Sequence, residues 1–551
     1  MSKMSIDLKS NPFYLTDEQI SWVNESLAAM TLDEKAGQLF FLNASGYRDE
    51  ELEKLVKEYA VGGTLFRPNK TFDELKERYA VLDGLAKYPL LKASNLESGG
   101  SGIASDGTFF SSQVGVAAAG DETLEHFAAA CAYEGAKSGI NITFSPVSDL
   151  SVNYMNPIIP TRSFGSDAKK AAAYTKRYVE VIQSAGIAAG AKHFPGDGID
   201  YRDQHLHPTY NTLSKEEWYE TYGQIYQGMI DAGLLSVMAG HICAPYVQMD
   251  IDPSLSPETC LPASLSPELL KGVLRGKLGF NGVIITDATI MTGFISAMDR
   301  KTAIPHAIEA GCDMLCFTTD IYEDIRFIKE GLDAGILSQN RLDEAVLRIL
   351  ALKAKVALKE PAFEEVPVRK WVKEAADNAV TLVKDTRSIL PVTKEKFDRI
   401  RIISKGNDRT PDGESIKEIV SSAFEAAGFA AEVYEPSFKD DLGPVTSEDP
   451  RVLTVYLVNM EDISNNTATR LFWFKKHALE IPRYVNELDY IFISFAYPYH
   501  LADVPRVPVY INAYSGNREC AEAVCEKLLG KSSFKGVSPL DPFCGLIDTR
   551  I

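Results

Sequence analysis

The stretch GVIITD (residues 282–287) shows the pattern on which the fold prediction rests. Its apolar residues are continuous rather than alternating, which is typical of a strand buried on both faces, as parallel strands are. Seven other runs of this kind occur in the first two thirds of the chain. They are GQLFFL (37–42), VGGTLF (61–66), LLKASN (90–95), INITFSP (140–146), IAAGAKHF (187–194), LLSVMAGH (234–241) and DMLCFT (313–318).

Each of these eight runs is followed by a segment that can form a helix. In DETLEHFAAACAYEGAKSGI (121–140) and KKAAAYTKRYVEVIQSAG (169–186), apolar residues recur with a period near 3.6 and glycine stands at the expected end. Eight β/α units over about 300 residues are within the usual size of a (β/α)₈ barrel. The sequence therefore predicts an α/β protein that begins with such a barrel.

The rest of the chain predicts a second, open α/β domain. RLDEAVLRILALKAKVAL (341–358) is the expected last helix of the barrel domain (1–358), and the charged, proline-containing segment 359–370 is the expected linker. Five further strand candidates follow within 371–551. They are RIRIIS (399–404), AAEVYE (430–435), VLTVYLV (452–458), YIFISFA (490–496) and VPVYINAY (507–514).

The composition restricts the partners of this 551-residue chain. Its formal net charge is −19 and it has no run of Lys or Arg, so nucleic acid and anionic membranes are poor partners, whereas a small neutral or cationic substrate fits. The N-terminal residues have no apolar signal-peptide region, which predicts a cytoplasmic location. The eight cysteines are scattered through apolar runs, so we expect reduced core residues, with no structural metal and no cofactor.

Polar residues at the expected strand ends are the candidate site, because active sites of such barrels lie at the carboxyl ends of the strands. This set suits a polyhydroxylated ligand. It comprises Arg67, Asn69, Asn95, Glu97, Asp149, Lys192, His193, His241 and Asp287. Asp287 is either a helix cap or a nucleophile or general base. The segment ATIMTGF that follows contains no obvious helix for Asp287 to cap, which favours a functional role.

The stretch AKHFPGDGIDYRDQHLHP (191–208) gathers more ionisable groups than a connecting loop requires. Lys192 and His193 are neighbours in a strand, so their side chains point to opposite faces unless a bulge intervenes. From Pro195 to Pro208 the low apolar content predicts a mobile loop over the barrel mouth.

Three functional interpretations of this stretch compete with an exposed loop that has no role. His193, His205 and His207 could hold a metal, but the aspartates fit no fixed ligand pattern. A phosphate loop would need a helix directly after the glycines. Asp203 lies two residues before His205 and could hold its ring for proton transfer.

Several motifs of the chain resemble the family 3 glycoside hydrolases, and within them the β-N-acetylhexosaminidase branch. They occur in the family's order over nearly the whole chain, and comprise TLDEKAGQLF, GGTLFRPN, NLESGG, FSPVSDL, NPIIPTRSFG, AKHFPGDG, the DQH triplet, VMAGHI, GVIITD, AGCDMLCF and RLDEAVLRILALK. The resemblance implies that residues 371–551 form the α/β sandwich domain that accompanies the barrel.

The resemblance also implies roles for individual residues. Asp287 corresponds to the nucleophile that forms a covalent glycosyl-enzyme, and His205 with Asp203 to the acid/base pair. Sugar-binding positions fall on Arg162, Lys192 and His193, and we expect the strand-end residues Asn95, Glu97 and His241 to contribute. His207, Asp197 and Asp200 are then left as solvated loop residues.

Two features depart from the family pattern. The family commonly has Asp-x-Glu-Gly-Gly after the third strand and an arginine a few residues on, whereas this chain has Asn95 and no such arginine. An acceptor-only carboxylate has thus become an amide. Gln204 also stands in the middle of the DQH triplet, where serine or threonine is usual.

The leading hypothesis is a retaining hydrolase that releases terminal β-linked N-acetylhexosamine, with N-acetylglucosamine (GlcNAc) as the expected sugar. A phosphorylase of the same fold is the alternative, because histidine tolerates an anionic acceptor better than a carboxylate does. A β-glucosidase would leave the DQH triplet unexplained, and a degenerate sugar-binding barrel would not need all three catalytic residues. A small carbohydrate or glycoconjugate is the expected partner, and a homodimer is a candidate assembly.

Overall fold

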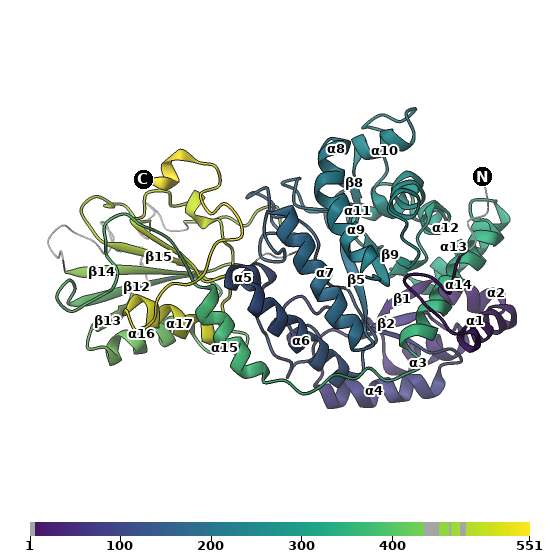
Figure 1. The fold of residues 1–551 in the computed structure, drawn as a ribbon, viewed down its shortest axis with the longest axis horizontal. Coiled ribbons are helices and arrows are strands. Elements are labelled where there is room, and N and C mark those ends of the chain that lie inside the picture. The colour runs from purple at the N-terminus through teal and green to yellow at the C-terminus, as the bar shows by residue number, and fades with distance from the viewer. Residues whose placement is uncertain (1–5, 435–450, 462–463, 474–480) are drawn as a thin grey trace. The chain divides into compact units, whose positions relative to one another are not determined.

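The computed structural model describes residues 6–434, 451–461, 464–473 and 481–551 (Figure 1). The chain divides into two compact units. The first comprises Met1–Thr108, Ala128–Leu150 and Asp167–Val366. The second comprises Phe109–Phe127, Ser151–Ser166 and Pro367–Ile551. Two segments from the first third of the sequence thus belong to the second unit.

The first unit contains a closed barrel of eight parallel strands, in the order β1-β10-β9-β7-β5-β4-β3-β2. This confirms the predicted barrel, because each of the eight apolar runs supplies one strand. The strands are β1 (Phe40–Asn43), β2 (Gly63–Leu65), β3 (Leu91–Ser94), β4 (Ile142–Thr143), β5 (Ala188–Phe194), β7 (Ser236–Ala239), β9 (Val283–Ala288) and β10 (Met314–Cys316). A short parallel pair, β6 (Thr209–Tyr210) and β8 (Ile242–Cys243), lies outside the barrel and was not predicted.

Helices alternate with the barrel strands along the chain, as Figure 1 shows. They are α1 (Asp17–Ala29), α2 (Leu32–Gln38), α3 (Asp49–Glu58), α4 (Phe72–Leu85), α6 (Asp121–Ser138), α7 (Ala168–Ser184), α8 (Lys215–Trp218), α9 (Gln224–Asp231), α10 (Pro245–Ile251), α11 (Thr292–Ile295), α12 (Arg300–Ala310), α13 (Ile321–Asp333) and α14 (Gln339–Val356). Tyr219–Gly223 and Glu268–Lys277 are π-helical.

Local capping signals fix where several of these helices begin. Thr31 accepts a hydrogen bond from the Glu34 N–H, and the Glu34 side chain accepts one from the Thr31 N–H. Such a capping box stabilises a helix start by about 1 kcal/mol. Helix α2 ends at Gln38, so the first apolar run begins its strand at Phe40 rather than at Gly37.

The second unit contains a six-stranded sheet in the order β11-β16-β15-β14-β12-β13. Its five parallel strands confirm the predicted second α/β domain. The strands are β11 (Thr381–Asp385), β12 (Arg399–Gly406), β13 (Ala430–Val433), β14 (Val452–Asn459), β15 (Tyr490–Ser494) and β16 (Val509–Asn512). The edge strand β11 runs antiparallel to β16 and was not predicted. Glu435, the end of one predicted strand, lies outside the described residues.

The two faces of this sheet pack differently. One face buries aliphatic residues such as Ile402, Val455 and Ile493 in one cluster with residues of the unit's long helices, among them Val420 and Val524. These helices are α15 (Val368–Ala379), α16 (Ile416–Ala426) and α17 (Arg518–Leu528), and the unit also contains α5 (Gln113–Ala119). The other face carries a row of stacked rings, in which Phe492 lies 5.8 Å from Tyr456 and 5.5 Å from Tyr510 between centroids.

Seven of the eight cysteines are buried and Cys544 is half-buried, all as free thiols, as expected for core residues. Within the described ranges, no helix combines the length and the apolar character that crossing a membrane requires.

Candidate active site

Asp287 lies near the carboxyl end of β9, at the barrel mouth. Its carboxylate accepts a hydrogen bond from the Ala288 N–H at 2.7 Å, and its side chain is 13% exposed. Burial opposes ionisation, but the nearby His193, His241 and His205 and the Ala288 N–H lower the pKa of Asp287 to about 2. The carboxylate is therefore ionised over the whole physiological range, as a nucleophile requires.

His193 connects Asp287 to a fully buried carboxylate. Its Nδ1 lies 2.6 Å from Asp149, which also accepts the His193 N–H, while Nε2 lies 3.8 Å from Asp287. Asp149 additionally accepts the Asp197 N–H at 2.7 Å. Because Nδ1–H is directed at Asp149, the ring presents Nε2 towards Asp287 and the barrel mouth.

Lys192 belongs to a polar group on the same edge of the barrel. Its ammonium lies 2.5 Å from Glu97 and donates to the side-chain Oδ1 of Asn95 at 3.0 Å. The pairing of β5 with β7 shifts register between Ala191 and Phe194, which is the irregularity that the sequence required if Lys192 and His193 were both to face the site. The structure thus brings together four of the predicted sugar-binding residues.

His205 and Asp203 form the predicted pair. His205 Nδ1 lies 2.6 Å from Asp203 Oδ1, which also accepts the His205 N–H at 2.9 Å. The Asp203 side chain is fully buried, whereas that of His205 is 21% exposed. This leaves Nε2 as the nitrogen that can carry and release a proton at the site.

The first part of the loop that bears His205, from Pro195 to Gly198, is buried, although the low apolar content of the loop led us to expect little packing. The Trp218 indole N–H donates to the Pro195 carbonyl at 2.8 Å, and the Tyr222 hydroxyl donates to the Asp197 carbonyl at 2.5 Å. Gly196, at φ 121°, leaves room for the Tyr222 ring, which a β-carbon there would meet at 2.2 Å. The loop gains from its neighbours the apolar contacts that its own sequence lacks.

Two aspartates that the sequence leaves as solvated are structural. Asp197 is 2% exposed and accepts from the Gly198 N–H and from the Gln204 side-chain amide. Asp200 forms a bidentate pair with Arg202 and accepts the Tyr210 N–H at 3.0 Å. The hydrogen-bond partners of Asp197 and Asp200 lie elsewhere in the loop or in β6. No short sequence motif specifies the spacing between these aspartates and their partners.

His241 is buried, with both ring nitrogens bound to protein atoms. Nδ1 lies 2.9 Å from the Ser264 hydroxyl, and Nε2 donates to the Ala288 carbonyl at 3.1 Å. Burial lowers the pKa of His241, so the ring is neutral. It is placed to support the backbone next to Asp287.

Arg162, the remaining predicted sugar-binding residue, lies in segment Ser151–Ser166 of the second unit. The other eight predicted site residues belong to the barrel unit. Within the described parts of the chain, no cluster of three or more His, Cys, Asp or Glu side chains could hold a metal ion.

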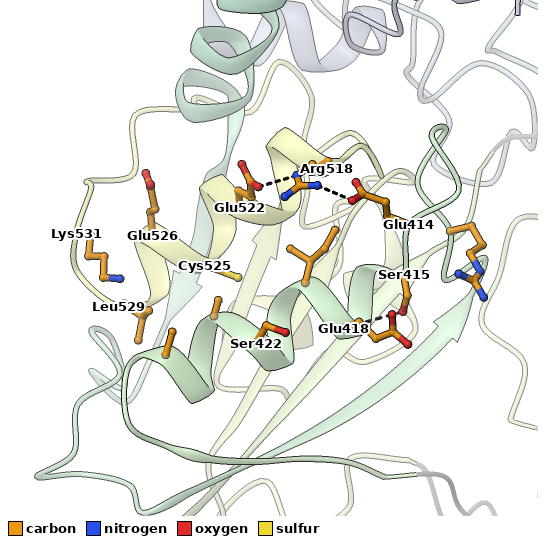
Figure 2. A pocket seen from close by; sticks show the side chains of 14 residues that line it. Glu414, Ser415, Glu418, Ser422, Arg518, Glu522, Cys525, Glu526, Leu529 and Lys531 are labelled. Carbon is orange, nitrogen blue, oxygen red and sulfur yellow. Dashed lines mark hydrogen bonds and ion pairs between the residues drawn. The ribbon is translucent and has the colours of Figure 1, made fainter. Parts of the chain in front are cut away.

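A groove of about 620 Å³ lies in the second unit between α16 and α17 (Figure 2). Arg518 pairs there with Glu414 at 2.5 Å and with Glu522 at 2.8 Å. Burial raises the pKa of the Cys525 thiol to about 12, so it stays protonated and is a poor nucleophile. The groove contains none of the predicted site residues.

The sequence did not assign roles to Asp149, Gln204 or Ser264. Asp149 was noted only for its place at a strand end, which is the signal by which it could be found. Gln204 and Ser264 form hydrogen bonds with His241, which is far from them in the sequence. Neither their residue type nor their position in the sequence indicates these contacts.

Comparisons with known proteins place the chain in a family. Residues 31–352 match the family model described as glycosyl hydrolase family 3 N terminal domain. A β-N-acetylglucosaminidase/β-glucosidase of Cellulomonas fimi is 39% identical over 565 aligned residues, which cover 99% of this chain and 100% of that relative.

Two solved structures are also similar. The β-glucoside phosphorylase BglX bound to 2FGlc is 39% identical and has a TM-score of 0.90, with 98% of this chain and 99% of that chain covered. A family 3 β-N-acetylglucosaminidase from Paenibacillus sp. str. FPU-7 is 23% identical, with a TM-score of 0.76 over 94% of this chain and 100% of that one. At 23% identity, the similarity to the Paenibacillus protein shows only that the two chains share a fold.

Proposed function

Because the chain belongs to glycosyl hydrolase family 3, a family of glycosidases, we propose that it cleaves terminal β-linked GlcNAc with retention of configuration. The observation that carries the proposal is the pairing of an ionised Asp287 with the His205–Asp203 pair in one barrel mouth. The Thr292 N–H donates to the His205 carbonyl at 3.0 Å, which ties the loop to the segment that follows Asp287.

In the first step, Asp287 attacks the anomeric carbon and the glycosidic C–O bond breaks. His205 transfers its Nε2 proton to the leaving oxygen, and Asp203 stabilises the ring that it orients. The product of this step is a covalent glycosyl-enzyme. Because the proton donor is an imidazole, this site does not need the raised carboxyl pKa that glycosidases with a carboxylic acid require.

In the second step, His205 accepts a proton from water as the hydroxide forms a bond to the anomeric carbon and Asp287 departs. Asn95, Glu97, Lys192 and His193 hold the sugar hydroxyls. His241 positions the backbone at Ala288, next to Asp287, and Arg162 remains a candidate sugar ligand.

The test uses p-nitrophenyl β-N-acetylglucosaminide and p-nitrophenyl β-glucoside side by side, because the Cellulomonas fimi relative carries both activities in its name. We expect turnover of the first substrate at least equal to that of the second, and its loss in Asp287→Ala. Absence of turnover on every aryl β-glycoside would reject the proposal.

Phosphorolysis is the second candidate. A specific likeness favours it, because the β-glucoside phosphorylase BglX is 39% identical over 98% of this chain. In that reaction a phosphate oxygen, rather than water, bonds to the anomeric carbon of the glycosyl-enzyme. A neutral histidine acid/base would not repel the incoming phosphate, whereas a carboxylate would.

Product analysis separates the two reactions. Turnover in phosphate and in a neutral zwitterionic buffer is followed by chromatography of the released sugar. Free sugar in both buffers supports hydrolysis, whereas sugar 1-phosphate formed in phosphate, with a faster rate there, supports phosphorolysis.

A further inference from the structure

Gln204 occupies the position between Asp203 and His205 where serine or threonine is usual in the family. It is 1% exposed, and both ends of its amide are bound. Its carbonyl oxygen accepts the His241 N–H at 2.8 Å, and its amide donates to Asp197 at 3.2 Å. A single side chain therefore links the acid/base loop to the end of β7 and to the turn after β5.

Two glycines, Gly240 and Gly293, pack closely against Gln204. A β-carbon added at Gly240 would lie 2.9 Å from the Gln204 amide oxygen. At Gly293 it would lie 2.2 Å from the Gln204 backbone oxygen. Glycine at these two positions lets the loop approach the barrel closely.

We propose that Gln204 is a positioning residue, which acts through His205 and sets where the acid/base nitrogen stands relative to the leaving oxygen. This inference rests on the proposed function. A serine side chain is too short to reach both the His241 N–H and the Asp197 carboxylate, so the usual residue could not make this clamp. The hydrogen bonds of the Gln204 side chain go to the His241 backbone N–H and to the Asp197 carboxylate.

If Gln204 positions His205, the loss of kcat/KM on changing Gln204 should depend on the leaving group of the substrate. A 2,4-dinitrophenolate departs without protonation, whereas a phenolate needs the proton from His205. A displaced His205 therefore lowers kcat/KM for a phenyl β-glycoside and leaves that for the 2,4-dinitrophenyl β-glycoside of the same sugar nearly unchanged. Because kcat/KM reports on the steps up to glycosyl-enzyme formation, slow deglycosylation does not mask the effect.

Gln204→Ser is the first variant. We expect kcat/KM for the phenyl glycoside to fall at least tenfold and that for the dinitrophenyl glycoside to change less than about threefold, given that general acid catalysis contributes 10²–10⁴ in rate. Equal losses on both substrates, or none on either, would overturn the inference. Inactivity of the wild type on both substrates would instead reject the proposed function.

A rescue experiment addresses variants that fold poorly. Gln204→Glu keeps the acceptor for the His241 N–H but sets a carboxylate against Asp197, so it should show the same selective loss. Adding Asp197→Asn restores a donor between the two side chains, and the double variant should recover most of the phenyl glycoside activity. Failure of the double variant to recover, with an unchanged melting temperature, would also overturn the inference.

Gly293→Ala provides an independent perturbation of the same loop, because the new methyl group would displace the Gln204 backbone. Gly228→Ala in α9 is the matched control, since a β-carbon there meets nothing within 4 Å. We expect the leaving-group selectivity to appear in the first variant and not in the second. The opposite pattern would contradict the clamp.

Discussion

Lys353 in α14 is a buried lysine whose ammonium group the fold disfavours. Its side chain is fully buried, and the hydrogen bond from Nζ to Gln38 Oε1 at 2.6 Å is its polar contact among the described residues. Burial lowers the pKa of Lys353 to about 7 from 10.5. Lys353→Met keeps the length of the side chain and removes the charge.

The magnitude follows from proton linkage. Between pH 7 and 10.5 the unfolded chain binds a proton that the native lysine does not, so wild-type stability rises with pH in this window. The shift is 10.5 − 7, or 3.5 units, and at 1.36 kcal/mol per unit the protonated lysine costs about 5 kcal/mol below pH 7. Methionine avoids this cost but leaves Gln38 Oε1 without a partner, which costs about 1–3 kcal/mol.

We therefore expect Lys353→Met to be more stable than the wild type by about 2–4 kcal/mol at pH 6. The difference should shrink by about 1.36 kcal/mol per pH unit as pH rises above 7. It should therefore change sign between about pH 8.5 and pH 10, where the neutral lysine keeps its hydrogen bond. Urea denaturation at several pH values measures this difference. Lys76→Met, at an exposed position of α4, is the control and should show no pH-dependent difference.

The explanation would be refuted by a Lys353→Met variant that is less stable than the wild type at pH 6. A difference in stability that stays constant from pH 6 to 9.5 would refute it as well.

Three further predictions concern the site and the barrel. Asp203→Asn should lower kcat/KM for a phenyl β-glycoside by about 10²-fold or more through the loss of the oriented His205 proton, with little effect on a 2,4-dinitrophenyl glycoside; equal effects on both would argue against the pair. Because the pKa of Asp287 is about 2, kcat/KM for the dinitrophenyl glycoside should stay level from pH 7 down to pH 4; an acidic limb between these values in a protein shown to be folded would contradict that assignment. Gly62→Ala should lower the free energy of unfolding by about 1–3 kcal/mol, because a β-carbon at Gly62 lies 2.1 Å from the Gln38 carbonyl; Gly84→Ala, with nothing within 4 Å, serves as control, and equal melting temperatures would count against the clash.

Much of the fold could be predicted from local pattern. The eight continuous apolar runs each became a barrel strand, because parallel strands buried on both faces need apolar side chains at every position. The edge strand β11 escaped prediction, since its short sequence TLVKD has a burial pattern that neither face dominates. The transfer of Phe109–Phe127 and Ser151–Ser166 to the second unit also left no mark in the sequence.

The candidate site divides in the same way. Strand ends and the two-residue spacing of Asp203 and His205 marked Asp287, Lys192, His193 and this pair as candidates in the sequence, and their expected roles came from the family resemblance. The low pKa of Asp287 could not, since it depends on imidazoles contributed by three separate segments.

The sequence by itself thus determined the barrel, its strand-end residues and the spacing of Asp203 and His205, all of which depend on residues close together in the chain. Only the tertiary structure decided that the His205 loop is packed, that Asp149 holds His193 and that Gln204 joins the loop to β7 and Asp197. These are contacts between segments up to 44 residues apart. Their energy depends on burial and distance, which exist only once the chain has folded.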